Sequence, residues 1–183
     1  MKPLTQVLLL VLEVMVIGQD RTYGLALCPG DTSVTDCMSC IADVTSKILT
    51  LCPNTRGVVM WNKFCMLKFF DKDFFGQIEN QTRHKIMDSQ NAKDPVKFGQ
   101  KTEDLLSKLA RIAFVKQRMY GRSTIKFAES KQLYLLAQCT RDITSIDCKR
   151  CLRNSISQLP NCCAGKKWAT VYSGSCIVGY QTF

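Results

Sequence analysis

Two stretches of the chain, 111 residues apart, show the same order of hydrophobic and polar positions. Each has a short apolar run that ends in a cysteine, and then apolar positions every three or four residues. That spacing predicts an amphipathic helix over residues 37–48 and another over residues 148–159. Ser33–Asp36 and Thr144–Asp147 have the Ser/Thr-x-x-acid form that begins a helix, although Asp in place of Glu makes the motif weaker.

Each predicted helix is followed by two β-prone runs. These are Gly57–Trp61 and Phe64–Phe70 in the first copy, and Trp168–Tyr172 and Ser175–Tyr180 in the second. Each copy therefore has a strand, a helix and two further strands. This order predicts one helix lying across an antiparallel sheet.

The second copy has additional elements before its repeated part. Residues 102–114 form an amphipathic pattern that predicts a helix, and residues 124–129 alternate like a strand. The first copy has no such sequence upstream, so we expect it to lack its first half. Residues 80–98 are polar and predict a linker. The expected modules are therefore residues 23–79 and residues 99–183.

The N-terminus has the pattern of a secretory leader. A lysine precedes an apolar run over residues 7–17, and glycines follow near plausible cleavage points, so we expect a signal peptide over residues 1–22. Glu13 interrupts the run, which leaves open an uncleaved helix or an incorrect gene start. After Ile17 no apolar run approaches the roughly 20 residues that span a bilayer, so we expect no transmembrane anchor.

Five cysteines recur in register 111 positions later. The first set is Cys28, Cys37, Cys40, Cys52 and Cys65, and the second is Cys139, Cys148, Cys151, Cys163 and Cys176. This agreement indicates a duplication. The chain has 11 cysteines in 183 residues, which favours an oxidising compartment and structural disulfides.

The sequence leaves two other uses of the cysteines open. Cys37/Cys40 and Cys148/Cys151 are C-x-x-C pairs at helix N-termini, where a thiol pKa falls, so a thiol–disulfide redox protein is an alternative. A zinc site would need a second close pair of ligands, and His84 is the only histidine. We expect no metal, no cofactor and no catalytic residue.

The net charge is +10, and residues 81–131 contribute +7 of it, from 12 Lys and Arg against 5 Asp and Glu. A solvated basic face accounts for this charge most simply, and attraction to acidic cell-wall polysaccharide or membrane headgroups is the functional alternative. No nucleic-acid-binding motif accompanies the charge, so we do not expect nucleic acid as a partner.

The repeated C-x8-C-x2-C spacing, with Tyr-x-Leu-Ala-x-Cys before it and Cys162-Cys-Ala-Gly-Lys166 after it, resembles the ginkbilobin-homologous, or stress-antifungal, domain of land plants. Tandem pairs of this domain form cysteine-rich repeat secretory proteins and the ectodomains of cysteine-rich receptor-like kinases. The resemblance implies an α+β fold of two modules. In each module, helices pack on an antiparallel sheet and disulfides within the module staple it, and the first module is truncated at its N-terminus. The resemblance also implies a protein secreted to the apoplast.

The family's bonding pattern implies four disulfides: Cys28–Cys37, Cys40–Cys65, Cys139–Cys148 and Cys151–Cys176. The pairing of Cys52, Cys162 and Cys163 stays open. Because 11 is odd, at least one thiol is free or intermolecular, and a covalent dimer through Cys52 is one alternative.

Antifungal members of the family bind mannose through an Asn, an Arg and a Glu. Here the Asn region is missing from the first copy. The Arg positions hold Val59 and Thr170, and the Glu positions hold Phe70 and Gln181. These side chains mostly cannot hold sugar hydroxyls, so a mannose site is not expected.

The sequence thus predicts a non-catalytic apoplastic binding module for cell-wall carbohydrate or a receptor ectodomain, acting in stress or defence. The alternatives are the redox protein and a degenerate family member without activity. Asn80-Gln-Thr82 is a glycosylation sequon in the predicted linker, so Asn80 is a candidate for a glycan.

Overall fold

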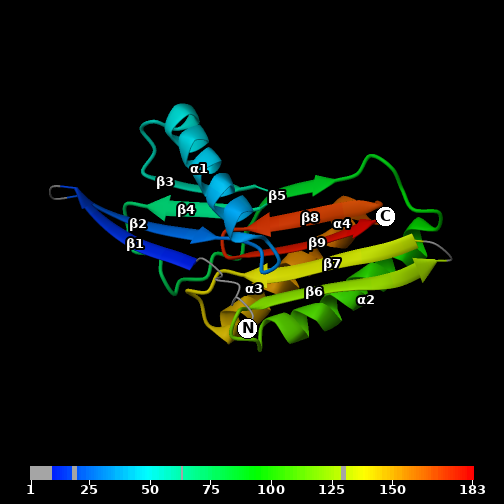
Figure 1. The fold of residues 1–183 in the computed structure, drawn as a ribbon. Helices are drawn as coiled ribbons and strands as arrows, with labels where there is room; N and C mark the ends of the chain where they lie inside the picture. Colours follow the sequence, from blue (N-terminus) through cyan, green and yellow to red (C-terminus); the bar gives the residue numbers. More distant parts are fainter. Residues whose placement is uncertain (1–9, 18–19, 63, 129–130) are drawn as a thin grey trace, which may run out of the picture. The chain divides into compact units, whose positions relative to one another are not determined.

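A computed structural model describes residues 10–17, 20–62, 64–128 and 131–183 (Figure 1). The chain divides into two compact units, Met1–Phe75 and Gly76–Phe183. Each unit combines an antiparallel sheet with helices, so the expected α+β class is confirmed.

Unit 1 is a four-stranded antiparallel sheet with one helix. Its elements are β1 (Leu10–Ile17), β2 (Asp20–Leu27), α1 (Val34–Leu51), β3 (Gly57–Trp61) and β4 (Met66–Phe70). The strands lie in the order β1-β2-β4-β3. Ser33 begins α1, because its hydroxyl accepts a hydrogen bond from the backbone N–H of Asp36 at 3.1 Å. Val44 and Ile48 on the buried face of α1 pack with the sheet around the unit's cysteines.

Strand β1 changes the interpretation of the N-terminus. Residues 10–17 pair with β2 over the whole of both strands, from Leu10 opposite Leu27 to Ile17 opposite Asp20. The expected signal peptide over residues 1–22 therefore overlaps β1 and ends inside β2, while residues 1–9 lie outside the described part of the chain. The alternative of an uncleaved helix is wrong for residues 10–17, because the backbone there forms a strand that pairs with β2.

Unit 2 is larger. Its elements are β5 (Thr82–Met87), α2 (Pro95–Ala113), β6 (Tyr120–Ala128), β7 (Lys131–Cys139), α3 (Ser145–Ser157), α4 (Leu159–Cys163), β8 (Trp168–Ser173) and β9 (Cys176–Thr182). The five strands are antiparallel in the order β5-β8-β9-β7-β6. Helices α2 and α3 pack on this sheet and on each other (Figure 1). Buried Leu106, Leu135 and Leu152 come from α2, β7 and α3 and share one core.

The two sheets have corresponding strand orders. Strands β1, β2, β4 and β3 of unit 1 match β6, β7, β9 and β8 of unit 2, and α1 matches α3. Among its described residues, unit 1 has no counterpart of β5 or α2. The repeat therefore extends one strand further toward the N-terminus than residue 23, where the first module was expected to begin, because β1 corresponds to β6.

The predicted linker over residues 80–98 is wrong. Residues 82–87 form β5, which pairs with β8 from Thr82 opposite Ser173 to Met87 opposite Ala169. Helix α2 begins at Pro95, seven residues before the predicted start. The Asp94 carboxylate accepts from the backbone N–H of Lys97 at 3.3 Å, and proline suits the first helical position.

Candidate binding cleft

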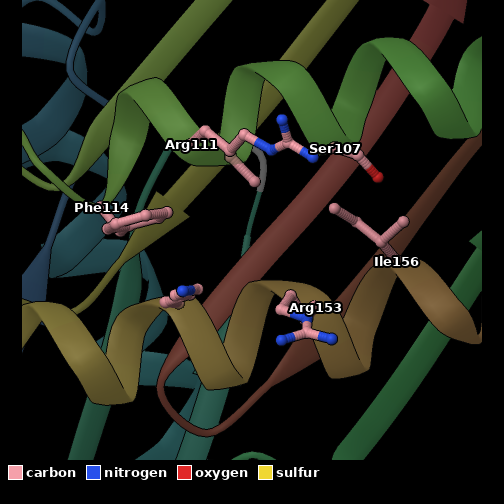
Figure 2. A pocket seen from close by; sticks show the side chains of 7 residues that line it. Ser107, Arg111, Phe114, Arg153 and Ile156 are labelled. Atoms are coloured by element: carbon pink, nitrogen blue, oxygen red, sulfur yellow. The ribbon is translucent and has the colours of Figure 1, made fainter.

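Helices α2 and α3 of unit 2 enclose a cleft of about 550 Å³ (Figure 2). Its lining consists of Ser107, Ala110, Arg111, Phe114, Lys149, Arg153 and Ile156. Phe114 is the C-cap of α2. The spacing along each helix is three or four residues, which places side chains on one helix face. The cleft is therefore lined by two facing helical stripes.

The two helices run in opposite directions past the cleft. Figure 2 shows Ser107 and Ile156 at one end, Phe114 at the other, and the side chains of Arg111 and Arg153 in the space between. At the Phe114 end, the Lys149 ammonium lies 5.6 Å from the centre of the phenyl ring, a cation–π contact. Ala110 and Ile156 are 5% and 4% exposed and belong to the core, so the cleft has an apolar floor.

Three cations surround this floor. Arg111, Lys149 and Arg153 are exposed, and in the described part of the chain none of them forms an ion pair. Arg150 on α3 differs, because its guanidinium lies 3.3 Å from the Asp147 carboxylate. Three unneutralised cations around one cleft create a positive potential that attracts an anionic ligand.

The first copy shows that the fold does not require this charge. At the positions of Lys149, Arg153 and Ile156, helix α1 carries Met38, Ala42 and Thr45, 111 residues earlier. Both helices have a capping hydroxyl, from Ser33 and Thr144, and two buried cysteines at corresponding positions. The cations therefore distinguish the second module.

The structure brings the cysteines together in five disulfides. Four are the pairs that the family resemblance implies: Cys28–Cys37, Cys40–Cys65, Cys139–Cys148 and Cys151–Cys176. The fifth joins the neighbours Cys162 and Cys163. Cys52 is free and half-buried at the C-cap of α1.

These pairings bear on the redox alternative. A C-x-x-C redox site works by closing a disulfide between its own two cysteines. Here Cys37 and Cys40 each bond a cysteine outside the motif, and so do Cys148 and Cys151. The four motif cysteines therefore act as structural cross-links.

The remaining candidate residues are not part of the cleft lining. Asn80 precedes β5, and its carbonyl accepts from the Asn154 side-chain amide at 2.6 Å. His84 is exposed on β5, with its ring stacked 6.4 Å from that of Tyr172. Thr170 and Gln181, at two positions of the family's mannose site, lie on the neighbouring strands β8 and β9.

The cleft residues are a finding of the structure. The amphipathic pattern over residues 102–114 locates Arg111 on a predicted helix, and the spacing of Lys149, Arg153 and Ile156 locates a stripe on another. Periodicity alone does not tell which two helices pack together, so the cleft could not be predicted from the sequence.

Comparison with known proteins identifies the family that has this architecture. A family described as "Salt stress response/antifungal" matches residues 12–72 and 85–182, one segment in each unit. The chain belongs to this family. No helix in the described ranges is long and apolar enough to cross a membrane.

The curated relatives support the same grouping. An antimicrobial ginkbilobin-2-like protein of Castanea crenata is 43% identical over 166 residues, which cover 91% of this chain and 69% of the relative. Cysteine-rich repeat secretory protein 38 of Arabidopsis thaliana is 38% identical over 166 residues, which cover 90% of this chain and 66% of the relative. The chain thus spans about two thirds of the length of these relatives.

A solved structure shares the fold. The tandem DUF26 ectodomain of the Arabidopsis thaliana cysteine-rich receptor-like protein PDLP8 matches with a TM-score of 0.75 at 26% identity. The match covers 92% of this chain and 79% of that structure. This chain therefore shares the fold of a tandem ectodomain of a receptor-like protein.

Proposed function

We propose that this protein is a non-catalytic binding protein of the apoplast, which acts in stress or defence by holding an acidic ligand between α2 and α3. Membership of a family whose relatives are named secretory and antimicrobial supports the compartment and the process. Five disulfides suit an oxidising environment.

The cleft supports the ligand class. Arg111, Lys149 and Arg153 lie around an apolar floor and have no carboxylate partner among the described residues. An exposed ion pair contributes about 0.2–1 kcal/mol, so two such contacts together amount to roughly a tenfold change in affinity. A neutral sugar would gain little from these cations, and a mannose site is not proposed.

The test is binding of the full chain to immobilised poly-glutamate. The cleft variant Lys149→Met/Arg153→Ala carries the residues of the first copy, which the same helix position already tolerates. The control variant Lys126→Gln/Lys131→Gln removes the same charge from exposed positions on β6 and β7. Both variants should keep the circular dichroism spectrum of the parent.

We expect salt-dependent binding that weakens about tenfold in the cleft variant and less than about twofold in the control. Equal weakening in the two variants would mean that net charge, and not the cleft, holds the ligand. In that case the proposal fails.

A further inference from the structure

The cleft has exposed apolar side chains beside its Phe114 end. Val115 directly follows Phe114 in the chain and is 68% exposed. Ile146 lies one helical turn before Lys149 on α3 and is 72% exposed. Burial of these two side chains against a partner would be favourable, because it removes apolar surface from water.

The chemistry of the lining discriminates between acidic ligands. Sugar hydroxyls both donate and accept hydrogen bonds, so a carbohydrate site offers acceptors such as amide or carboxylate oxygens. Arg111, Lys149 and Arg153 only donate, and Ser107 is the one uncharged hydrogen-bonding side chain of the lining. This set matches carboxylates and apolar groups better than it matches a polyhydroxylated chain.

The size of the cleft fits a short peptide. Residues 107–114 cover about 12 Å of helix axis at roughly 1.5 Å per residue. A helical segment of a partner rises by the same amount per residue, so about eight residues, or roughly two turns, span this length. An amphipathic segment lying in a groove between helices is a recurring mode of recognition.

We propose that the occupant is an acidic segment of a protein partner that carries a large apolar side chain. Its carboxylates contact Arg111 and Arg153, whose planar guanidinium groups bind carboxylates through paired hydrogen bonds. Its apolar side chain covers Phe114, Val115 and Ile146. This inference rests on the proposed function and names the class of partner for the same cleft.

The experiment uses two synthetic peptides with the full chain. Both are rich in glutamate, and one has two leucines at helical spacing where the other has serines. The apolar variant Val115→Ser/Ile146→Ser changes two exposed side chains, so it should fold like the parent. Affinities are measured by fluorescence anisotropy for the parent, for this variant and for the cleft and control variants defined above.

We expect the leucine peptide to bind the parent about tenfold more tightly than the serine peptide. The apolar variant should abolish this difference while poly-glutamate binding stays unchanged. The cleft variant should weaken both peptides, and the control variant neither.

Two outcomes overturn the inference alone. Equal binding of the two peptides, or stronger cleft-dependent binding of polygalacturonate than of the leucine peptide, would mean that a polyanion without apolar groups is the ligand. If no acidic probe depends on Lys149 and Arg153, the proposed function fails together with the inference.

Discussion

The three disulfides of unit 2 should contribute to stability in the order of the loops that they close. Cys151–Cys176 spans 25 residues, Cys139–Cys148 spans 9, and Cys162–Cys163 joins neighbours. A cross-link stabilises mainly by restricting the unfolded chain, and this effect grows with the logarithm of the loop length. Replacement of each pair by alanine therefore tests whether these bonds are structural.

The chain-entropy relation gives the magnitudes. Loss of Cys151–Cys176 should lower the free energy of unfolding by about 3.5 kcal/mol, and loss of Cys139–Cys148 by about 2.6 kcal/mol. Cys162–Cys163 closes no loop, so its loss should lower the free energy of unfolding the least. The Ser173 hydroxyl lies 3.0 Å from the Cys151 sulfur, but it also donates to the Cys176 carbonyl and accepts from two backbone N–H groups, so the alanine variant leaves it satisfied.

The assay is guanidinium unfolding followed by tryptophan fluorescence. Trp61 lies in unit 1 and Trp168 on β8 of unit 2, and the chain has two tryptophans. A Trp61→Phe background therefore reports unit 2 alone. An equal loss for all three alanine pairs, or the largest loss for Cys162–Cys163, would refute the reasoning.

Thr144→Ala should lower the stability of unit 2 by about 1 kcal/mol in the same assay, because Thr144 Oγ1 accepts from the Asp147 N–H at 3.1 Å; Thr144→Ser should not. Burial raises the pKa of Tyr180 to about 12 from 10.0, so its phenol stabilises the fold below pH 10, and this contribution is lost as the pH rises through 12. Tyr180→Phe should remove that loss, and a phenolate titration in which Tyr180 ionises near pH 10 would contradict it. Protein secreted from plant cells should carry a glycan that Asn80→Gln removes, as intact mass would show; an unmodified Asn80 would contradict the assignment of this sequon as a glycan site.

The repeated module was predictable because local pattern and cysteine register agree. Ser33 and Thr144 begin α1 and α3 as their motifs predict, and Gly57–Trp61 is strand β3 with the predicted bounds. Both cysteines of each C-x-x-C pair lie on the buried face of their helix. In these segments the helical and alternating periods directly report the buried face.

The ends of the modules were harder to predict for a physical reason. Residues 10–17 are apolar enough to resemble a signal peptide, and only their pairing with β2 identifies a strand. Residues 82–87 include Arg83, His84 and Lys85, and β5 is an edge strand that depends on pairing with β8, more than 80 residues away. Such long-range pairing leaves no local period.

The cleft depends on packing in the same way. Arg111 and Arg153 are 42 positions apart, and each is an ordinary exposed cation on its own helix. Contact between α2 and α3 brings them to one cavity. The excess of basic residues in the sequence gave an acidic partner only as the alternative to a solvated face, and it could not say where such a partner binds.

The most direct test of the central claim is a map of amide chemical shifts for the full chain with and without the glutamate–leucine peptide. Changes concentrated in residues 107–115 and 146–156 are the predicted result. Changes concentrated in the β6–β7 hairpin around Lys126 and Lys131, or in α1, would contradict the assignment of the cleft as the binding site.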